Sequence, residues 1–116
     1  LEMKRTQVKP YQEPKPRVFL AQLGDMAKKK SLRLFSALEK NGILIAESFG
    51  RGSLKSQMRV ANRLGVEVTV IIGQKEALDE TAIVKDMVSG TQETVTQEKL
   101  VDAVKKILKT NVALNV

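Results

Sequence analysis

A candidate phosphate-binding stretch lies at residues 48–65, which read SFGRGSLKSQMRVANRLG. Gly50 and Gly52 flank Arg51 directly before a predicted helix, and the free backbone N–H groups at a helix start attract anions. The glycine spacing is G-x-G-S-x-K, which matches neither G-x-G-x-x-G nor G-x-x-x-x-G-K-[ST]. The stretch therefore indicates an anion site without either of the two nucleotide-binding fingerprints.

The predicted helix within this stretch has one basic edge. Ser53 is suited to cap its start and Gly65 to end it. On a helical wheel, one narrow arc holds Arg51, Lys55, Arg59 and Asn62, with Arg63 on its flank. The opposite side holds Leu54, Met58, Ala61 and Leu64. An ordinary solvated helix face has this pattern, and so does a helix that contacts a phosphate backbone; the residues alone leave both open.

Three carboxylates stand at or near predicted strand ends, namely Glu47, Glu76 and Asp86. Two carboxylates can hydrolyse a glycosidic bond only when they flank it, and nothing in this spacing indicates that arrangement. Surface carboxylates that balance nearby lysines are the simpler interpretation.

Composition excludes several classes of chemistry. The 116 residues contain no Cys and no His, so thiol nucleophiles, Cys/His zinc sites and an imidazole base are absent. Three Phe, one Tyr and no Trp disfavour a module that stacks many bases on aromatic rings. No apolar run approaches the roughly 18 residues of a membrane span. We therefore expect a cytoplasmic protein that does not bind membranes.

Positive charge is concentrated in the first half of the chain. The formal net charge is +7, and residues 1–63 hold 14 Lys/Arg against 5 Asp/Glu, whereas residues 64–116 hold 6 against 8. Such asymmetry is typical of proteins that bind a polyanion, although soluble cationic domains show it too.

Apolar runs alternate with helical periods after residue 17. Strands are expected at residues 17–24, 43–49 and 66–73, with one helix from an Asp25 cap to Asn41-Gly42 and another after Ser53. This β-α-β-α-β order predicts parallel strands joined by right-handed crossovers, with helices on both faces of the sheet.

The last third predicts a hairpin and a helix. Residues 81–87 and 91–96 alternate like strands around Val88-Ser89-Gly90, and residues 97–109 have helical spacing, so an antiparallel strand must join the sheet. The expected fold is a three-layer α/β/α domain with about five strands and three helices, over residues 17–109. Residues 1–16 contain all three prolines and are interpreted as a linker or a cloning remnant. Residues 110–116 form a tail, either frayed or a short strand.

Four segments together carry a family resemblance: VFLAQLGDMAKKKSLRLFSALEKNGI, GRGSLKSQMRVANRLGVEVTVIIGQKE, IVKDMVSGTQETV and the closing amphipathic helix. In order and spacing they resemble the anticodon-binding domain of class II aminoacyl-tRNA synthetases. S-L-K-x-Q at residues 53–57, A-x-x-L-G at 61–65 and G-x-Q at 90–92 are most similar to the histidyl-tRNA synthetases.

The resemblance implies a five-stranded mixed sheet in the order 2-1-3-4-5, with strand 4 antiparallel. It implies an upstream catalytic domain that holds ATP and Mg²⁺, so that this chain would need no cofactor and catalyse nothing alone. The expected partner is the anticodon stem-loop of a tRNA. The parent ligase would be a homodimer, and the isolated domain could be a monomer.

The resemblance also implies roles for particular residues. Arg51 and the turn from Ser53 to Lys55 would hold the anticodon loop. From the basic edge of the helix, and not from the resemblance, we expect Arg59 to contact the RNA backbone. Glu76 and Lys85 would face bases, Glu76 as an acceptor and Lys85 as a donor. Gln92 could accept or donate. Three alternatives stay open: a threonyl, glycyl or prolyl relative, an α/β domain that binds a small nucleotide, and a protein-interaction module.

Overall fold

The computed structural model describes residues 15–47 and 53–114, which form one sheet with helices on both faces. The elements follow in the order β1 (Val18–Gln22), α1 (Asp25–Lys40), β2 (Ile45–Glu47), α2 (Leu54–Leu64), β3 (Val68–Ile72), α3 (Gln74–Asp79), β4 (Thr81–Asp86), β5 (Gln92–Thr96), a 3-10 turn (Gln97–Lys99) and α4 (Leu100–Leu114).

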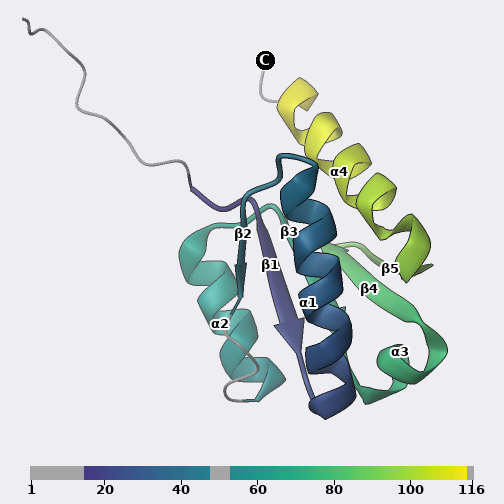
Figure 1. Cartoon of the computed structure of the whole chain (residues 1–116). Coiled ribbons are helices and arrows are strands. Elements are labelled where there is room, and N and C mark those ends of the chain that lie inside the picture. The colour runs from purple at the N-terminus through teal and green to yellow at the C-terminus, as the bar shows by residue number, and fades with distance from the viewer. Residues whose placement is uncertain (1–14, 48–52, 115–116) are drawn as a thin grey trace, which may run out of the picture.

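The sheet has the strand order β2-β1-β3-β4-β5 (Figure 1). Strand β1 runs parallel to both β2 and β3. Strand β4 runs antiparallel to both β3 and β5. The expected fold class and sheet order are therefore confirmed.

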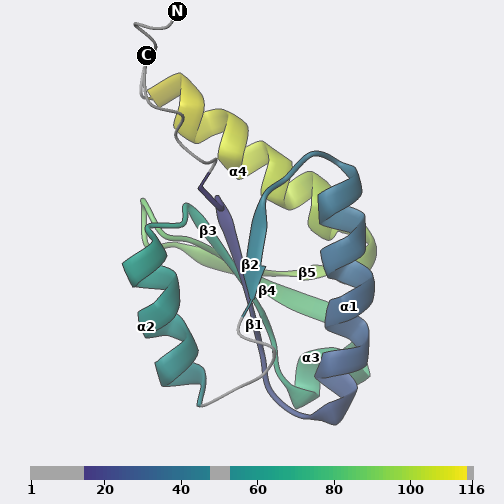
Figure 2. The ribbon, with the colours of Figure 1, turned by 60° about the vertical axis from the view of Figure 1, so that its left-hand side comes forward.

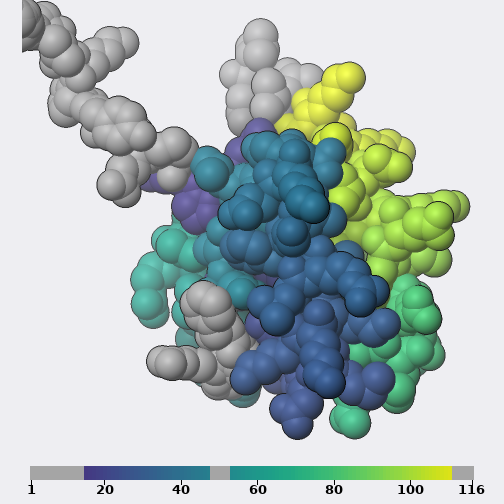
Figure 3. Space-filling view, in the orientation of Figure 1, coloured from purple at the N-terminus to yellow at the C-terminus, as the bar shows by residue number. Residues whose placement is uncertain are grey.

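Helix α2 lies on one face of the sheet, and α1, α3 and α4 lie on the other (Figure 2). Side chains of β1 alternate between the two layers: Val18 and Leu20 pack into the α1 side, and Phe19 and Ala21 into the α2 side. All five residues of β1 and of β3 are buried, which explains their near-continuous apolar sequences. In the space-filling view, α1 and α4 cover most of the face turned to the viewer (Figure 3).

Arg17 joins the start of the sheet to two other segments, by an ion pair with Glu67 before β3 and a hydrogen bond to α4. The guanidinium of Arg17 donates to both carboxylate oxygens of Glu67, at 2.5 and 3.0 Å, and to the backbone oxygen of Leu108 at 3.2 Å. These bonds to Glu67 raise the pKa of Arg17 above its ordinary value. Arg17 is thus a structural cation of the fold, held by three hydrogen bonds.

Four details differ from the expectations. Gly24, not Asp25, is the N-cap of α1: its backbone oxygen accepts the first helical hydrogen bond, from the N–H of Lys28 at 3.1 Å, and its φ of 91° favours glycine. Leu64 is 38% exposed rather than packed with the apolar face of α2. The short helix α3 was not expected. Helix α4 continues to Leu114, so most of residues 110–116 are neither a frayed tail nor a strand.

Candidate nucleic-acid interface

Helix α2 presents the basic edge that the sequence predicts. Ser53 caps the helix, and its Oγ accepts a hydrogen bond from the backbone N–H of Ser56 at 3.2 Å. Gly65 ends the helix in the left-handed conformation, with a φ of 71°. Lys55 and Arg59 are exposed between these ends. Arg51 lies outside the described residues.

Gln57 attaches α2 to the sheet from the buried side of the helix. Its side-chain Oε1 accepts from the backbone N–H of Gln22 at 2.9 Å, and its Nε2 donates to the backbone oxygen of Gln22 at 2.8 Å. Strand β2 ends at Glu47, which lies opposite Leu20, so the β2 side of Gln22 has no strand neighbour among the described residues. The amide of Gln57 therefore takes the place of one more residue of β2.

A carboxylate lies beside this attachment. The side chain of Gln22 is buried, and its Nε2 donates to Oε2 of Glu47 at 3.1 Å. Burial raises the pKa of Glu47 above its ordinary value, because removal from water disfavours the charged form. The end of β2 is thus a partly buried polar site next to the start of α2.

Lys85 and Gln92 are direct neighbours on the sheet. They lie opposite each other on β4 and β5, and Thr69 of β3 lies opposite Lys85 on its other side. Lys85 is two residues from Ile83, which packs with the α2-side cluster, so this row of side chains is on the α2 face. Lys85 is half-buried and Gln92 is exposed. The structure thus brings together two of the residues expected to contact bases.

The α2 face of β4 and β5 has no helix over it among the described residues (Figure 2). Helix α2 packs on β1, and the side chains of β5 on this face are all exposed. We name this area the open face and define it by Lys85, Gln92, Thr94 and Thr96. A flat polar surface bordered by a basic helix suits a nucleic acid whose bases are splayed out.

Glu76 is not part of the open face. It stands at the third position of α3, and its Oε1 accepts from the backbone N–H of Gly73 at 2.8 Å. A Cβ at residue 73 would lie 2.8 Å from this oxygen, so a larger residue there would require the flexible carboxylate of Glu76 to shift. Lys85 lies opposite Thr69, three residues before β3 ends, and Glu76 follows the end of β3. Glu76 is therefore about 10 Å or more from Lys85 along the strand direction.

The three carboxylates considered for acid–base chemistry do not converge. Glu47 ends β2, Glu76 caps α3, and Asp86 lies at the opposite end of the sheet, across from Val68. Oδ1 of Asp86 accepts from the backbone N–H groups of Val88 and Ser89, so Asp86 fixes the β4–β5 turn. No cluster of three or more metal-binding side chains occurs in residues 15–47 and 53–114.

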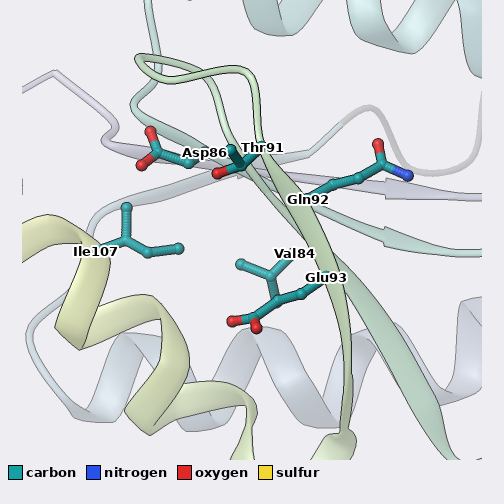
Figure 4. A pocket seen from close by; sticks show the side chains of 6 residues that line it. All are labelled: Val84, Asp86, Thr91, Gln92, Glu93 and Ile107. Carbon is teal, nitrogen blue, oxygen red and sulfur yellow. The ribbon is translucent and has the colours of Figure 1, made fainter.

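A cavity of about 220 Å³ lies on the other side of the hairpin, between β5 and α4 (Figure 4). Asp86, Thr91, Glu93 and Ile107 surround it, and the side chain of Gln92 points away from it. Its carboxylates would repel a nucleic acid. The orientation of Gln92 agrees with its position on the open face.

The sequence did not single out Thr94 and Thr96 of the open face, nor two buried residues beneath the interface, Gln57 and Thr69. Gln57 was noticed only within a motif, although a Gln among the apolar positions of α2 is itself a signal of a buried polar contact. Thr69 gave no signal, because one threonine in a buried strand fits ordinary β propensity.

The comparison with protein families decides the assignment. A family model described as "Anticodon binding domain" matches residues 17–107. The chain belongs to the anticodon-binding domain family. The match covers β1 through most of α4, so every described element of this anticodon-binding domain falls wholly or mainly within it.

Curated relatives are histidine–tRNA ligases. That of Dehalococcoides mccartyi is 37% identical over 106 residues, which are 91% of this chain and 25% of the ligase. That of Staphylococcus aureus is 34% identical over 89 residues, which are 77% of this chain and 21% of the ligase. The anticodon-binding domain spans about a quarter of the length of these relatives.

Solved structures with the same fold include two histidyl-tRNA synthetases. The apo enzyme of S. aureus matches with a TM-score of 0.71 and 30% identity, over 83% of this chain and 28% of that one. The enzyme of Nostoc sp. PCC 7120 matches with a TM-score of 0.75 and 26% identity, over 82% and 23%. A prolyl-tRNA synthetase from Cryptosporidium parvum, at 13% identity and a TM-score of 0.75, shares the fold alone.

Proposed function

We propose that this anticodon-binding domain is part of a histidine–tRNA ligase and binds the anticodon stem-loop of its tRNA on the open face and α2. The observation that carries the proposal is the adjacency of Lys85 and Gln92 on an uncovered sheet surface beside a basic helix. The histidine assignment is supported by the 37% and 34% identity to histidine–tRNA ligases.

Helix α2 would bind the RNA backbone. Lys55 and Arg59 are exposed, and no acidic residue occurs in the first turn of the helix. Phosphates would therefore meet cations and the positive end of the helix dipole together. Such contacts hold the loop in place but do not distinguish one base from another.

The open face would distinguish the bases. The ammonium of Lys85 can donate to base oxygens or ring nitrogens, and the amide of Gln92 can both donate and accept. Bases of an anticodon loop are unstacked, so their edges are accessible to side chains that stand on a sheet. Aromatic stacking is not required, which agrees with the low aromatic content of the chain.

Glu76 stays a prediction as a base acceptor. One of its oxygens already accepts from Gly73, and the other is available to a base amino or imino group. Its distance from Lys85 means that the two would contact different nucleotides. Arg51 and the residues from Ser53 to Lys55 at the start of α2 likewise stay predicted contacts to the anticodon loop.

The remaining part of the proposal concerns the parent ligase. ATP, Mg²⁺ and histidine would bind an upstream catalytic domain in a cytoplasmic homodimer, and this domain would catalyse nothing alone. No helix among the described residues is long and apolar enough to cross a bilayer.

Titration of the domain with anticodon stem-loops tests the proposal. We expect the stem-loop with a histidine anticodon to bind more tightly than the same loop with another anticodon, and the affinity to fall as salt rises. Threonine, glycine and proline anticodons serve as controls for the related ligases. An affinity that ignores both the anticodon and the ionic strength would refute tRNA binding, and preference for a control anticodon would refute the histidine assignment.

A further inference from the structure

Thr69 carries a hydroxyl that the fold leaves without a partner. The residue lies in β3, in the middle of the sheet, and its side chain is fully buried. Among the described residues, no group forms a hydrogen bond with its Oγ1. The other four residues of β3 are Val or Ile, and a valine has nearly the shape of threonine without the hydroxyl. Because a buried hydroxyl without a partner costs stability, packing alone does not account for this hydroxyl.

The side chain of Thr69 lies on the α2 side of the sheet. On one side it has Phe19 of β1 opposite it, which packs in the α2-side cluster. On its other side it has Lys85 of β4 opposite it. Glu67, two residues earlier in the chain, already binds Arg17 with both carboxylate oxygens. The register of the sheet therefore makes Lys85 the polar neighbour of the hydroxyl.

Lys85 stands between two side chains that can accept a hydrogen bond. The backbone N–H of Met87 donates to the oxygen of Glu67 at 2.8 Å. Because hydrogen-bonded pairs alternate along an antiparallel ladder, Thr69 and Lys85 form the next such pair, with Cα atoms about 5.5 Å apart. Lys85 and Gln92 form the closer kind of pair, at about 4.5 Å. The lysine thus has a buried hydroxyl on one side and an exposed amide on the other.

We propose that Thr69 is a positioning residue for base recognition: its Oγ1 accepts a hydrogen bond from the ammonium of Lys85 when a base covers the open face. This role rests on the tRNA binding proposed above, because it concerns the same contact to RNA. An ammonium has three N–H donors and no acceptor. In the free protein Lys85 is half-buried and forms no ion pair within the described part of the chain, so water is the partner of its donors.

A base bound at the open face displaces this water. The ammonium of Lys85 then needs other acceptors for the donors that the base does not use, because an unpaired donor removed from water is costly. The hydroxyl of Thr69 is such an acceptor, and a buried strand holds it in place. With one donor fixed on Thr69, a base without an acceptor at the right place leaves the ammonium unpaired. Thr69 therefore contributes to the choice between bases more than to the affinity for RNA in general.

Thr69→Val tests this role, because it removes the hydroxyl and keeps the shape of the side chain. We expect the preference for the matching anticodon stem-loop over the same loop with another anticodon to fall by about tenfold, since a hydrogen bond to a charged group is lost. The salt dependence of binding should stay as in the wild type, because no phosphate contact changes. In urea unfolding the variant should be at least as stable as the wild type, because the hydroxyl has no partner in the free protein.

Thr69→Ser is the conservative variant. It keeps the hydroxyl and loses a buried methyl group, so it should retain most of the anticodon preference and be less stable than the wild type. A purely structural role of Thr69 would instead move preference and stability in the same direction in both variants.

Ser31→Ala is the matched control. Ser31 is also fully buried, and its Oγ also lacks a partner among the described residues, but it lies on α1, on the other face of the sheet. Its loss should leave the anticodon preference unchanged. In a Lys85→Ala background, Thr69→Val should have no further effect on the preference, because Thr69 acts through Lys85.

Fluorescence titrations of these variants with matched and mismatched stem-loops decide the role of Thr69. A Thr69→Val variant with the preference of the wild type, or an equal loss in the Lys85→Ala background, would overturn the positioning role and leave the proposed tRNA binding intact. A wild type without a preference among anticodons would overturn anticodon recognition itself, and the role of Thr69 with it.

Discussion

Gln57 and Gln22 form a closed pair in which one side-chain amide satisfies both backbone groups of the last residue of β1, at 2.9 and 2.8 Å. Gln57 is 1% exposed. A carboxamide has the same donor and acceptor as a peptide group, and it extends the sheet where β2 ends. The pair holds α2, and with it the basic edge, on the sheet together with the packing of Ala61 in one cluster with Phe19 and Ala21.

We predict that Gln57→Leu lowers the free energy of unfolding by about 2–4 kcal/mol, because two buried backbone groups lose their partner. Urea unfolding followed by circular dichroism measures the change. Asn62→Leu, at an exposed position of the same helix, is the control and should change stability by no more than about 0.5 kcal/mol. Equal effects of the two variants would show that the pair does not hold α2.

Periodic features of the fold were predictable from the sequence. The buried runs of β1 and β3, the Ser53 cap and the Gly65 end of α2 follow from local chemistry that few other conformations satisfy. The open face was predictable only in part. Lys85 and Gln92 were named as separate contacts, and their adjacency depends on the register of the hairpin.

Other features depend on contacts distant in sequence. Helix α3 has six residues, too few for a periodic pattern, and it begins with a bond between Glu76 and Gly73 that a search for Ser or Thr caps does not find. Leu64 has the spacing of a core residue but lies at the exposed end of α2. Tertiary packing decides such positions.

We predict that Glu47→Gln removes a pH dependence of stability. Burial raises the pKa of Glu47 in the folded state, so the folded protein binds the proton more tightly than the unfolded chain. Stability is therefore lost as pH rises from the ordinary glutamate pKa of about 4.3 through the raised value. Glu47→Gln keeps the acceptor for Gln22 without this charge. Urea unfolding at pH 4 and pH 7 should show a gain for the variant at pH 7 alone; equal differences at both pH values would contradict the prediction.

We predict that Glu76→Ala and Glu76→Gln separate two roles of this residue. Glu76→Ala should lower the free energy of unfolding by about 1 kcal/mol, because the backbone N–H of Gly73 loses its acceptor, whereas Gln keeps an acceptor oxygen. If the carboxylate also accepts from a base, both variants should lose discrimination between anticodons. A Glu76→Gln variant that discriminates as the wild type does would limit Glu76 to the cap.

We predict different RNA-binding defects for Arg59→Ala and Lys85→Ala. Arg59→Ala should weaken binding of all stem-loops alike and reduce the salt slope by about 0.7 for one lost phosphate contact. Lys85→Ala should reduce the preference for the matching anticodon instead. Fluorescence titrations at several salt concentrations separate these effects. Lys109→Ala, an exposed position of α4, is the matched control for loss of a cation; identical behaviour of the Arg59 and Lys85 variants would refute the division of roles.

The most direct measurement is the mapping of backbone amide shifts in a uniformly ¹⁵N-labelled domain during titration with the histidine anticodon stem-loop. The largest changes should fall on Lys55, Arg59, Lys85, Gln92 and Thr94, which lie on α2 and the open face. Amides on the outer side of α1, such as those of Leu32 and Ser36, should stay in place. Shifts centred on α1 or α4, with none on β4 and β5, would contradict binding of the anticodon at the open face.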